Sequence, residues 1–230
     1  MPVPAIIRVA APDPGPGDDT VGLVYPTDVR FGDILIALLF CDAGAAQTLN
    51  LAAFSSSPIF FEVGNTGDSV RRGVAVFARA AVESDVAASG VTFTIPTSGG
   101  TGTHGGCVAL IRDGHTVGGI HVAGEAGITS STTPAPASVT TTLEDELVIA
   151  AIAYANTGTI TTLAPNEWSE GAEVQNDGAN SYSFQSIVVP AAATISGDTA
   201  TLGTSGNWGV VTFAVKPLVK VFLPSPIVVN

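Results

Sequence analysis

The sequence predicts an all-β fold: a single large antiparallel β-sandwich made of two similar halves, with extended arms at both ends. Three observations lead to this prediction. Short apolar runs alternate with polar residues at a period of two, and the 26 Gly and 15 Pro residues separate them. Charged residues make up only 12% of the chain, and few residues with high helix propensity are present. Finally, segments of the first half recur in the second half.

The internal duplication rests on four pairs of similar segments that occur in the same order along the chain. The spacing between them slips only in gaps rich in Gly, Ser and Thr. The paired segments are residues 32–37 with 145–150, 63–67 with 174–178, 89–95 with 196–202, and 106–112 with 209–216. Four ordered matches predict two copies of one supersecondary unit, each too long for a solenoid repeat and sized as half of a large sandwich.

The first half is expected to hold a series of short strands. Residues 33–40 are almost wholly apolar, so both faces of this strand should be covered. Residues 91–95 alternate between apolar and polar, as a half-buried strand does, and residues 65–68 have the composition of a turn. The expected strands lie at residues 21–25, 33–40, 60–63, 70–80, 91–95 and 107–111.

The second half is expected to repeat this series. Between the halves, residues 119–122 form a weak strand, and residues 129–142 are polar and β-prone. The strands expected in the second half lie at residues 146–154, 168–175, 181–189, 198–202 and 209–215.

These expectations divide the chain into a sandwich and two arms. The predicted boundaries are an N-terminal Pro/Gly-rich arm at 1–20, half 1 at about 21–113, a linker at 114–142, half 2 at about 143–216, and an apolar C-terminal arm at 217–230. Residues 11–19 should be extended and polyproline-like, whereas residues 4–10 could form a short strand.

The C-terminal arm combines an apolar composition with three prolines. The prolines prevent it from being a central strand throughout, and its few polar groups make it a poor free tail in water. We therefore expect it to contact its own domain or a partner chain. The residues expected to make this contact are Val219, Val221, Phe222, Leu223, Ile227, Val228 and Val229.

The charge of the chain argues against binding to nucleic acid or to an anionic membrane. The formal net charge is −12, Lys216 and Lys220 are the only lysines, and Arg71 and Arg72 are the only adjacent cations. No apolar run approaches the roughly 18 residues of a membrane helix, and no secretory signal is visible at the N-terminus. The acidity is typical of a soluble protein whose copies repel one another.

Motifs for cofactors and metals are incomplete. Residues 100–105 match the letters of a dinucleotide fingerprint, but a β-run follows where the motif requires a helix. His104, His115 and His121 have no third ligand at metal spacing, so we expect surface or turn histidines. Cys41 and Cys107 could be neighbours, although buried free thiols are favoured. No metal, cofactor or nucleotide is expected.

Candidate catalytic and sugar-binding residues are equally sparse. Adjacent residues 144–146 are all acidic, and a strand would point them to opposite faces, so a solvated strand edge is favoured over a catalytic pair. Trp168, Trp208 and Tyr182 could form a platform that stacks on sugars, although core or rim packing is commoner. No nucleophile elbow occurs, and the protein is not expected to be an enzyme.

The order of segments resembles a known structural module. In each half a Gly-Asp or Glu-Asp turn leads into an apolar strand, and an aromatic strand follows. A strand ending in Ala-Ala, a short Thr-rich strand and a Gly-rich turn come next, and the last strand of the second half closes on Lys-Pro. The segments are 32–40 and 145–154, 60–63 and 168–174, 74–81 and 185–192, and 205–217. Over residues 20–217 the series resembles the duplicated jelly-roll-like β-sandwich modules of tailed-bacteriophage structural proteins: head decoration or cement proteins, head fibres and tail adhesins.

The resemblance implies a non-enzymatic virion structural protein, made in the host cytoplasm and located on the capsid surface. It would decorate or cement the capsid through contacts with the major capsid protein and with copies of itself, as a homo-oligomer, most simply a trimer. The alternative is a tail or fibre adhesin module that binds host-surface glycans. The first half departs from the pattern because it has Phe60-Phe61 where the second has Trp168. The module carries no catalytic residues over to this chain.

Overall fold

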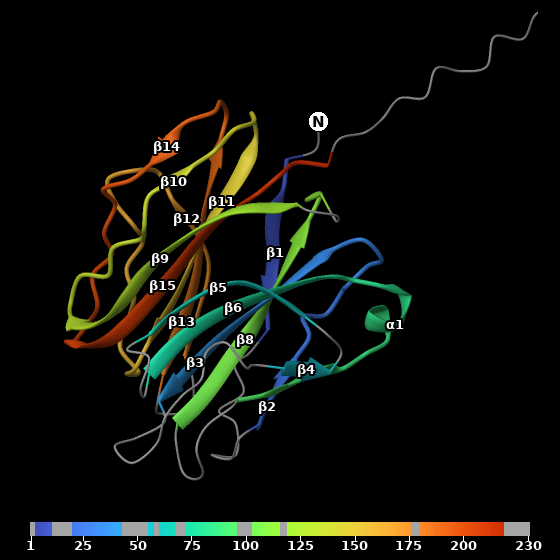
Figure 1. Ribbon diagram of the computed structural model, residues 1–230, viewed down its shortest axis with the longest axis horizontal. Helices are drawn as coiled ribbons and strands as arrows, with labels where there is room; N and C mark the ends of the chain where they lie inside the picture. Colours follow the sequence, from blue (N-terminus) through green and yellow to red (C-terminus); the bar gives the residue numbers. More distant parts are fainter. Residues whose placement is uncertain are drawn as a thin grey trace, which may run out of the picture.

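The fold, seen in a computed structural model, is built from antiparallel strands that form two five-stranded sheets and two small sheets (Figure 1). The structure describes residues 3–10, 20–42, 55–57, 60–67, 72–95, 103–115, 119–175 and 180–218. Within these ranges the only helix is α1 (Glu83–Val86). The predicted all-β sandwich is therefore confirmed, whereas the jelly-roll-like detail stays a prediction.

The first large sheet has the strand order β1-β8-β3-β6-β5, and the second has the order β12-β13-β11-β15-β9. The first consists of β1 (Ala5–Val9), β8 (Thr103–Arg112), β3 (Ile34–Asp42), β6 (Arg72–Ala80) and β5 (Phe61–Gly67). The second consists of β12 (Ser169–Gln175), β13 (Ser181–Val189), β11 (Glu146–Tyr154), β15 (Gly206–Val215) and β9 (Ile120–Ser131). The small sheets are β2 (Thr20–Val24), β7 (Gly90–Thr94) and β4 (Ser55–Ser57), and β10 (Val139–Thr140) with β14 (Thr194–Ile195).

The strand orders show that the chain contains two copies of one unit. In the first sheet β1, β8, β3, β6 and β5 occupy the places that β9, β15, β11, β13 and β12 occupy in the second. The two sheets face each other in opposite order, with β3 against β11, β6 against β15, β8 against β13, β5 against β9 and β1 against β12. A two-fold rotation about the central strands produces this reversal. The copies are therefore related as the subunits of a symmetric dimer are, but within one chain.

The turns that precede the two central strands repeat in atomic detail. Gly32 before β3 and Asp145 before β11 both have a positive φ, 88° and 58°. At the next position, Asp33 Oδ2 accepts a hydrogen bond from the Arg30 backbone N–H at 2.8 Å. Glu146 Oε1 accepts one from the Leu143 backbone N–H at 2.7 Å. Each buried carboxylate thus closes the turn that leads into its strand.

Three apolar cores lie between the four layers. The central core fills the space between the large sheets and includes Phe40, Phe184 and Phe213. A second core lies between the first large sheet and the β2-β7-β4 sheet. The third covers the outer face of the second large sheet, beneath β10 and β14. Both faces of β3 and β11 are buried, which is why these strands are apolar throughout.

Some segments differ from the sequence-based expectation. Residues 120–131, all of which lie within the predicted linker, form the long strand β9. Their small side chains give little strand signal, and pairing with β15 orders them. The strand expected at 198–202 is wrong, because only isolated bridges occur there, Ala164 with Thr199 and Ile160 with Leu202. Asp198 accepts hydrogen bonds from the backbone and side chain of Asn166 instead, so it anchors a loop.

Both predicted arms extend beyond what the structure describes. Residues 5–9 of the N-terminal arm form β1, but residues 11–19 lie outside the described ranges. At the C-terminus the description ends at Leu218. No helix in the described part of the chain is long and apolar enough to cross a membrane.

Candidate functional site: the end where the chain enters and leaves the sandwich

Both ends of the described chain lie beside the turn after β8. Ala5 at the start of β1 pairs with Arg112, and the backbone N–H of Leu218 donates to the Asp113 carbonyl at 3.0 Å. Pro217 forms an isolated bridge with Gly114. The two terminal segments therefore reach the body at neighbouring positions, as Figure 1 shows for β1 and the segment after β15.

A buried ion pair attaches the loop before β3 to the same place. The Arg112 guanidinium donates to both carboxylate oxygens of Asp33, at 3.0 Å and 2.9 Å, and to the Asp28 carbonyl at 2.9 Å. Asp33 is 4% exposed. The hydrogen bond to Asp33 raises the pKa of Arg112 above its usual value. A two-point contact of this kind fixes the loop in position as well as neutralising the buried charge.

Apolar side chains are exposed on this loop and on the helix beside it. Phe31 is 77% exposed, and Val82 and Val86 are 41% and 50% exposed. The Gly32 backbone N–H donates to the Ala81 carbonyl at 3.0 Å. Phe31 precedes Gly32 and Val82 follows Ala81, so this hydrogen bond brings the two apolar residues to neighbouring segments. Val82 is the N-cap residue of α1, and Val86 is the last residue of this one-turn helix. We call Phe31, Val82 and Val86 the apolar end surface.

A buried polar cluster holds α1 beneath this surface. Asp85 Oδ2 accepts hydrogen bonds from the Val82 backbone N–H at 2.8 Å and from Arg79 Nε at 3.0 Å. Burial, and then the nearby Asp85 carboxylate, raise the pKa of Tyr25 to about 12, although the Arg79 charge opposes the shift. The ion pair and the helix cap make the apolar end surface a defined shape.

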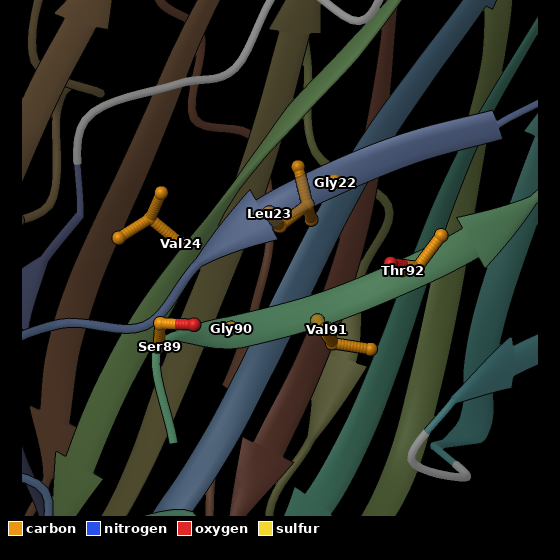
Figure 2. A pocket seen from close by; sticks show the side chains of 7 residues that line it. All are labelled: Gly22, Leu23, Val24, Ser89, Gly90, Val91 and Thr92. Carbon is orange, nitrogen blue, oxygen red and sulfur yellow. The ribbon is translucent and has the colours of Figure 1, made fainter. Parts of the chain in front are cut away.

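A shallow depression lies nearby, between β2 and β7 (Figure 2). Its lining consists of Gly22, Leu23, Val24, Ser89, Gly90, Val91 and Thr92. The lining offers hydroxyl groups and aliphatic side chains, without a ring or a charged group. A Cβ at Gly90 would lie 2.1 Å from the Leu23 carbonyl oxygen, so this glycine is required for close pairing of the two strands.

The residues predicted to mediate attachment are outside the described part of the chain. Val219, Val221, Phe222, Leu223, Ile227, Val228 and Val229 all follow Leu218, the last described residue. Their predicted role stays a prediction. The structure shows only where the segment that carries them begins, next to Asp113 and the loop that Arg112 holds.

One of the three histidines is placed differently from the expectation. His104 is 1% exposed within β8, opposite Cys41, so its assignment to the surface or a turn is wrong. The strand already begins at Thr103, and alternation turns the side chain of the next residue inward. His115 is half-buried in the turn after β8. In the described residues, no three His, Cys, Asp or Glu side chains gather as a metal site would require.

The aromatic platform and the acidic strand edge are also corrected. Trp168 and Trp208 are each 6% exposed and Tyr182 is fully buried, so they pack in the interior and do not stack on sugars. Trp208 Nε1 donates to Ser131 Oγ at 2.9 Å. Glu146 is fully buried because it closes the turn before β11, whereas its neighbour Glu144 is exposed.

The two cysteines are buried, form no disulfide and lie on opposite faces of the first sheet. Cys41 belongs to the core beneath β2 and β7, and Cys107 to the central core. Their thiols therefore point away from each other, and burial raises the pKa of Cys107.

Sequence reasoning did not identify the apolar end surface or the Arg112–Asp33 pair. These two charges are 79 residues apart, and nothing in either local sequence links them. An aromatic residue between Arg30 and Gly32, in a turn that should be polar, was the available signal for Phe31. Compared with protein-family models, curated proteins and solved structures, the chain matches none.

Proposed function

We propose that the protein is a non-enzymatic structural protein of a tailed-bacteriophage virion that decorates or cements the outside of the capsid. It binds the major capsid protein and other copies of itself, most simply as a trimer, and is made in the host cytoplasm. The observation that carries the proposal is the meeting of both terminal segments at one end of a rigid sandwich, at Ala5–Arg112 and Leu218–Asp113. Such a body has one attachment end and leaves its other faces for solvent.

The construction of the body suits a structural role. Three cores tie four layers together, and the two copies bury a continuous apolar interface between them. The four buried carboxylates of the described residues have structural roles: Asp33 pairs with Arg112, Asp85 pairs with Arg79, Glu146 closes a turn, and Asp198 accepts hydrogen bonds from Asn166. A protein built in this way resists unfolding and holds its terminal segments in fixed relative positions.

The C-terminal segment would supply most of the attachment. At about 25 cal/mol per Å² of apolar surface, covering several side chains of the size of Phe222 or Leu223 is worth several kcal/mol. The alternative function is a glycan-binding tail or fibre module. The tryptophan rings that suggested it, Trp168 and Trp208, are buried and are therefore not available to stack on sugars.

The experiment is a shell-binding assay that compares three proteins: a shortened chain, a full-length variant and the natural chain. One chain ends after Leu218, because Leu218 still bonds to the body. A second keeps its length but carries Phe222→Ser and Leu223→Ser, which controls for loss of length, and the third is unchanged. Empty shells of the virus are saturated with each chain, and occupancy is counted by cryo-electron microscopy.

We expect both variants to keep their far-UV circular dichroism spectrum and to lose most of their occupancy on the shell. Full occupancy by the shortened chain would show that the sandwich itself is the anchor. Binding of none of the three chains to any shell, with binding to host-surface polysaccharide instead, would replace the proposal with the adhesin function.

A further inference from the structure

We propose that the apolar end surface is a docking site for residues 219–230 of the same chain. In the free protein this segment would cover Phe31, Val82 and Val86, and the particle or another partner would have to displace it. The inference concerns the free chain, so it holds whether or not the protein decorates a capsid.

The first argument is position. The segment begins at Leu218, whose backbone N–H bonds to Asp113. Arg112, which precedes Asp113, donates hydrogen bonds to the Asp28 carbonyl and to the Asp33 carboxylate. Phe31 lies in the loop between Asp28 and Asp33. The segment therefore starts only a few contacts away from the apolar end surface. An extended chain covers roughly 3.3 Å per residue, so the six or seven residues after Leu218 span about 20 Å.

The second argument is chemical. Phe31 at 77% exposure, with Val82 and Val86, leaves an aromatic ring and two branched side chains in water. The segment carries seven large apolar residues of its own: Val219, Val221, Phe222, Leu223, Ile227, Val228 and Val229. Contact between the two sets removes both from water, and burial of apolar area is the dominant favourable term in association.

The third argument is charge. Lys220 is one of only two lysines in a chain of net charge −12. Two exposed carboxylates flank the apolar end surface: Glu83 lies between Val82 and Val86, and Asp113 accepts the Leu218 hydrogen bond at its carbonyl, whereas the Asp28 carboxylate already pairs with Arg8 at 3.7 Å. An ammonium group two residues beyond Leu218 is attracted to this end of the molecule.

Docking within one chain is favoured over docking between chains. A segment tethered at Leu218 presents itself at an effective concentration in the millimolar range, well above the concentration of other copies in dilute solution. The acidic net charge further opposes the approach of a second copy.

The test is disulfide cross-linking of the full-length protein with conservative substitutions. One variant carries Ser84→Cys on α1 and Ser225→Cys in the segment. The matched control carries Ser205→Cys and Ser225→Cys, because Ser205 is exposed just before β15, at the opposite end of that strand from Val215. Cys41 and Cys107 are buried and do not compete. Each protein is treated with a mild oxidant, and the products are separated without reductant.

We expect the Ser84→Cys pair to form an intramolecular disulfide at least about tenfold faster than the control pair, as the difference in effective concentration requires. Phe31→Ser with Val86→Ser in the same background should remove most of that advantage, and circular dichroism confirms that the body remains folded. A disulfide-linked dimer would assign the surface to a second copy and overturn the proposal. Equal rates in the two pairs, or a rate unaffected by Phe31→Ser with Val86→Ser, would overturn it as well.

Discussion

Gly209 on β15 provides a direct test of how the two copies pack. The residue is buried where the large sheets face each other, and a Cβ added there would lie 2.6 Å from Val74 Cγ2 and 3.1 Å from Thr66 Cγ2. Val74 is fully buried and β-branched, so it cannot rotate away at low cost. We expect Gly209→Ala to destabilise the protein by about 1–3 kcal/mol, the usual cost of overpacking a core. For a chain of this size that corresponds to a fall in Tm of about 2–12 °C.

A double-mutant cycle separates this clash from other effects. Val74→Ala alone should cost about 2 kcal/mol, because it removes two buried methyl groups and leaves a cavity. In the Val74→Ala background the 2.6 Å contact is gone and only the 3.1 Å contacts to the Cβ of residue 74 and to Thr66 Cγ2 remain, so Gly209→Ala should cost clearly less there than in the natural background. Urea unfolding followed by tryptophan fluorescence measures all four proteins. The packing argument is refuted if Gly209→Ala is harmless in the natural background, or if the two costs simply add.

Other predictions concern buried polar groups and thiols. Glu146→Gln should lower stability by about 1–3 kcal/mol in urea unfolding, because the amide replaces a charged acceptor of backbone N–H groups; an unchanged midpoint would contradict this role. Tyr25 has a pKa raised from 10.0 to about 12. Its contribution to the free energy of unfolding is therefore complete below pH 10 and is lost as the pH rises from 10 to 12. The Tm of Tyr25→Phe should therefore fall less between pH 10 and pH 12 than the Tm of the natural protein. Parallel curves of Tm against pH for the two proteins would contradict the burial of the Tyr25 hydroxyl beside Asp85. Cys41 and Cys107 should react with a thiol reagent only after unfolding, and rapid labelling of the native protein would show that their cores open.

The sequence was most informative where local pattern and tertiary environment agree. The run at 33–40 predicted a strand covered on both faces, and β3 is buried on both faces. Residues 91–95 predicted a half-buried strand, and β7 alternates between buried and exposed residues. By contrast, residues 120–131 form β9 only because β15 offers them a partner, and their Gly and Ala residues carry no strong preference of their own.

The functional end was less predictable than the fold. The sequence indicated that the C-terminal segment is apolar and needs a cover, but not where that segment leaves the body. It favoured a surface or turn position for His104, which is buried, and it left a sugar-stacking role open for Trp168, which is buried as well. A single side chain can face either way when its strand shifts by one residue, so the face of an isolated ring or imidazole is not encoded locally.

The sequence by itself determined the all-β class, the duplication and the order of most strands, because these follow from periodicity and turn residues that act within a few positions of one another. Only the tertiary structure decided that the copies pack face to face about a two-fold axis, that Arg112 reaches Asp33, and that the two terminal segments meet beside the turn after β8. These features depend on contacts between residues far apart in the chain. The energy of such contacts resides in packing and charge pairing, which no local stretch of sequence records.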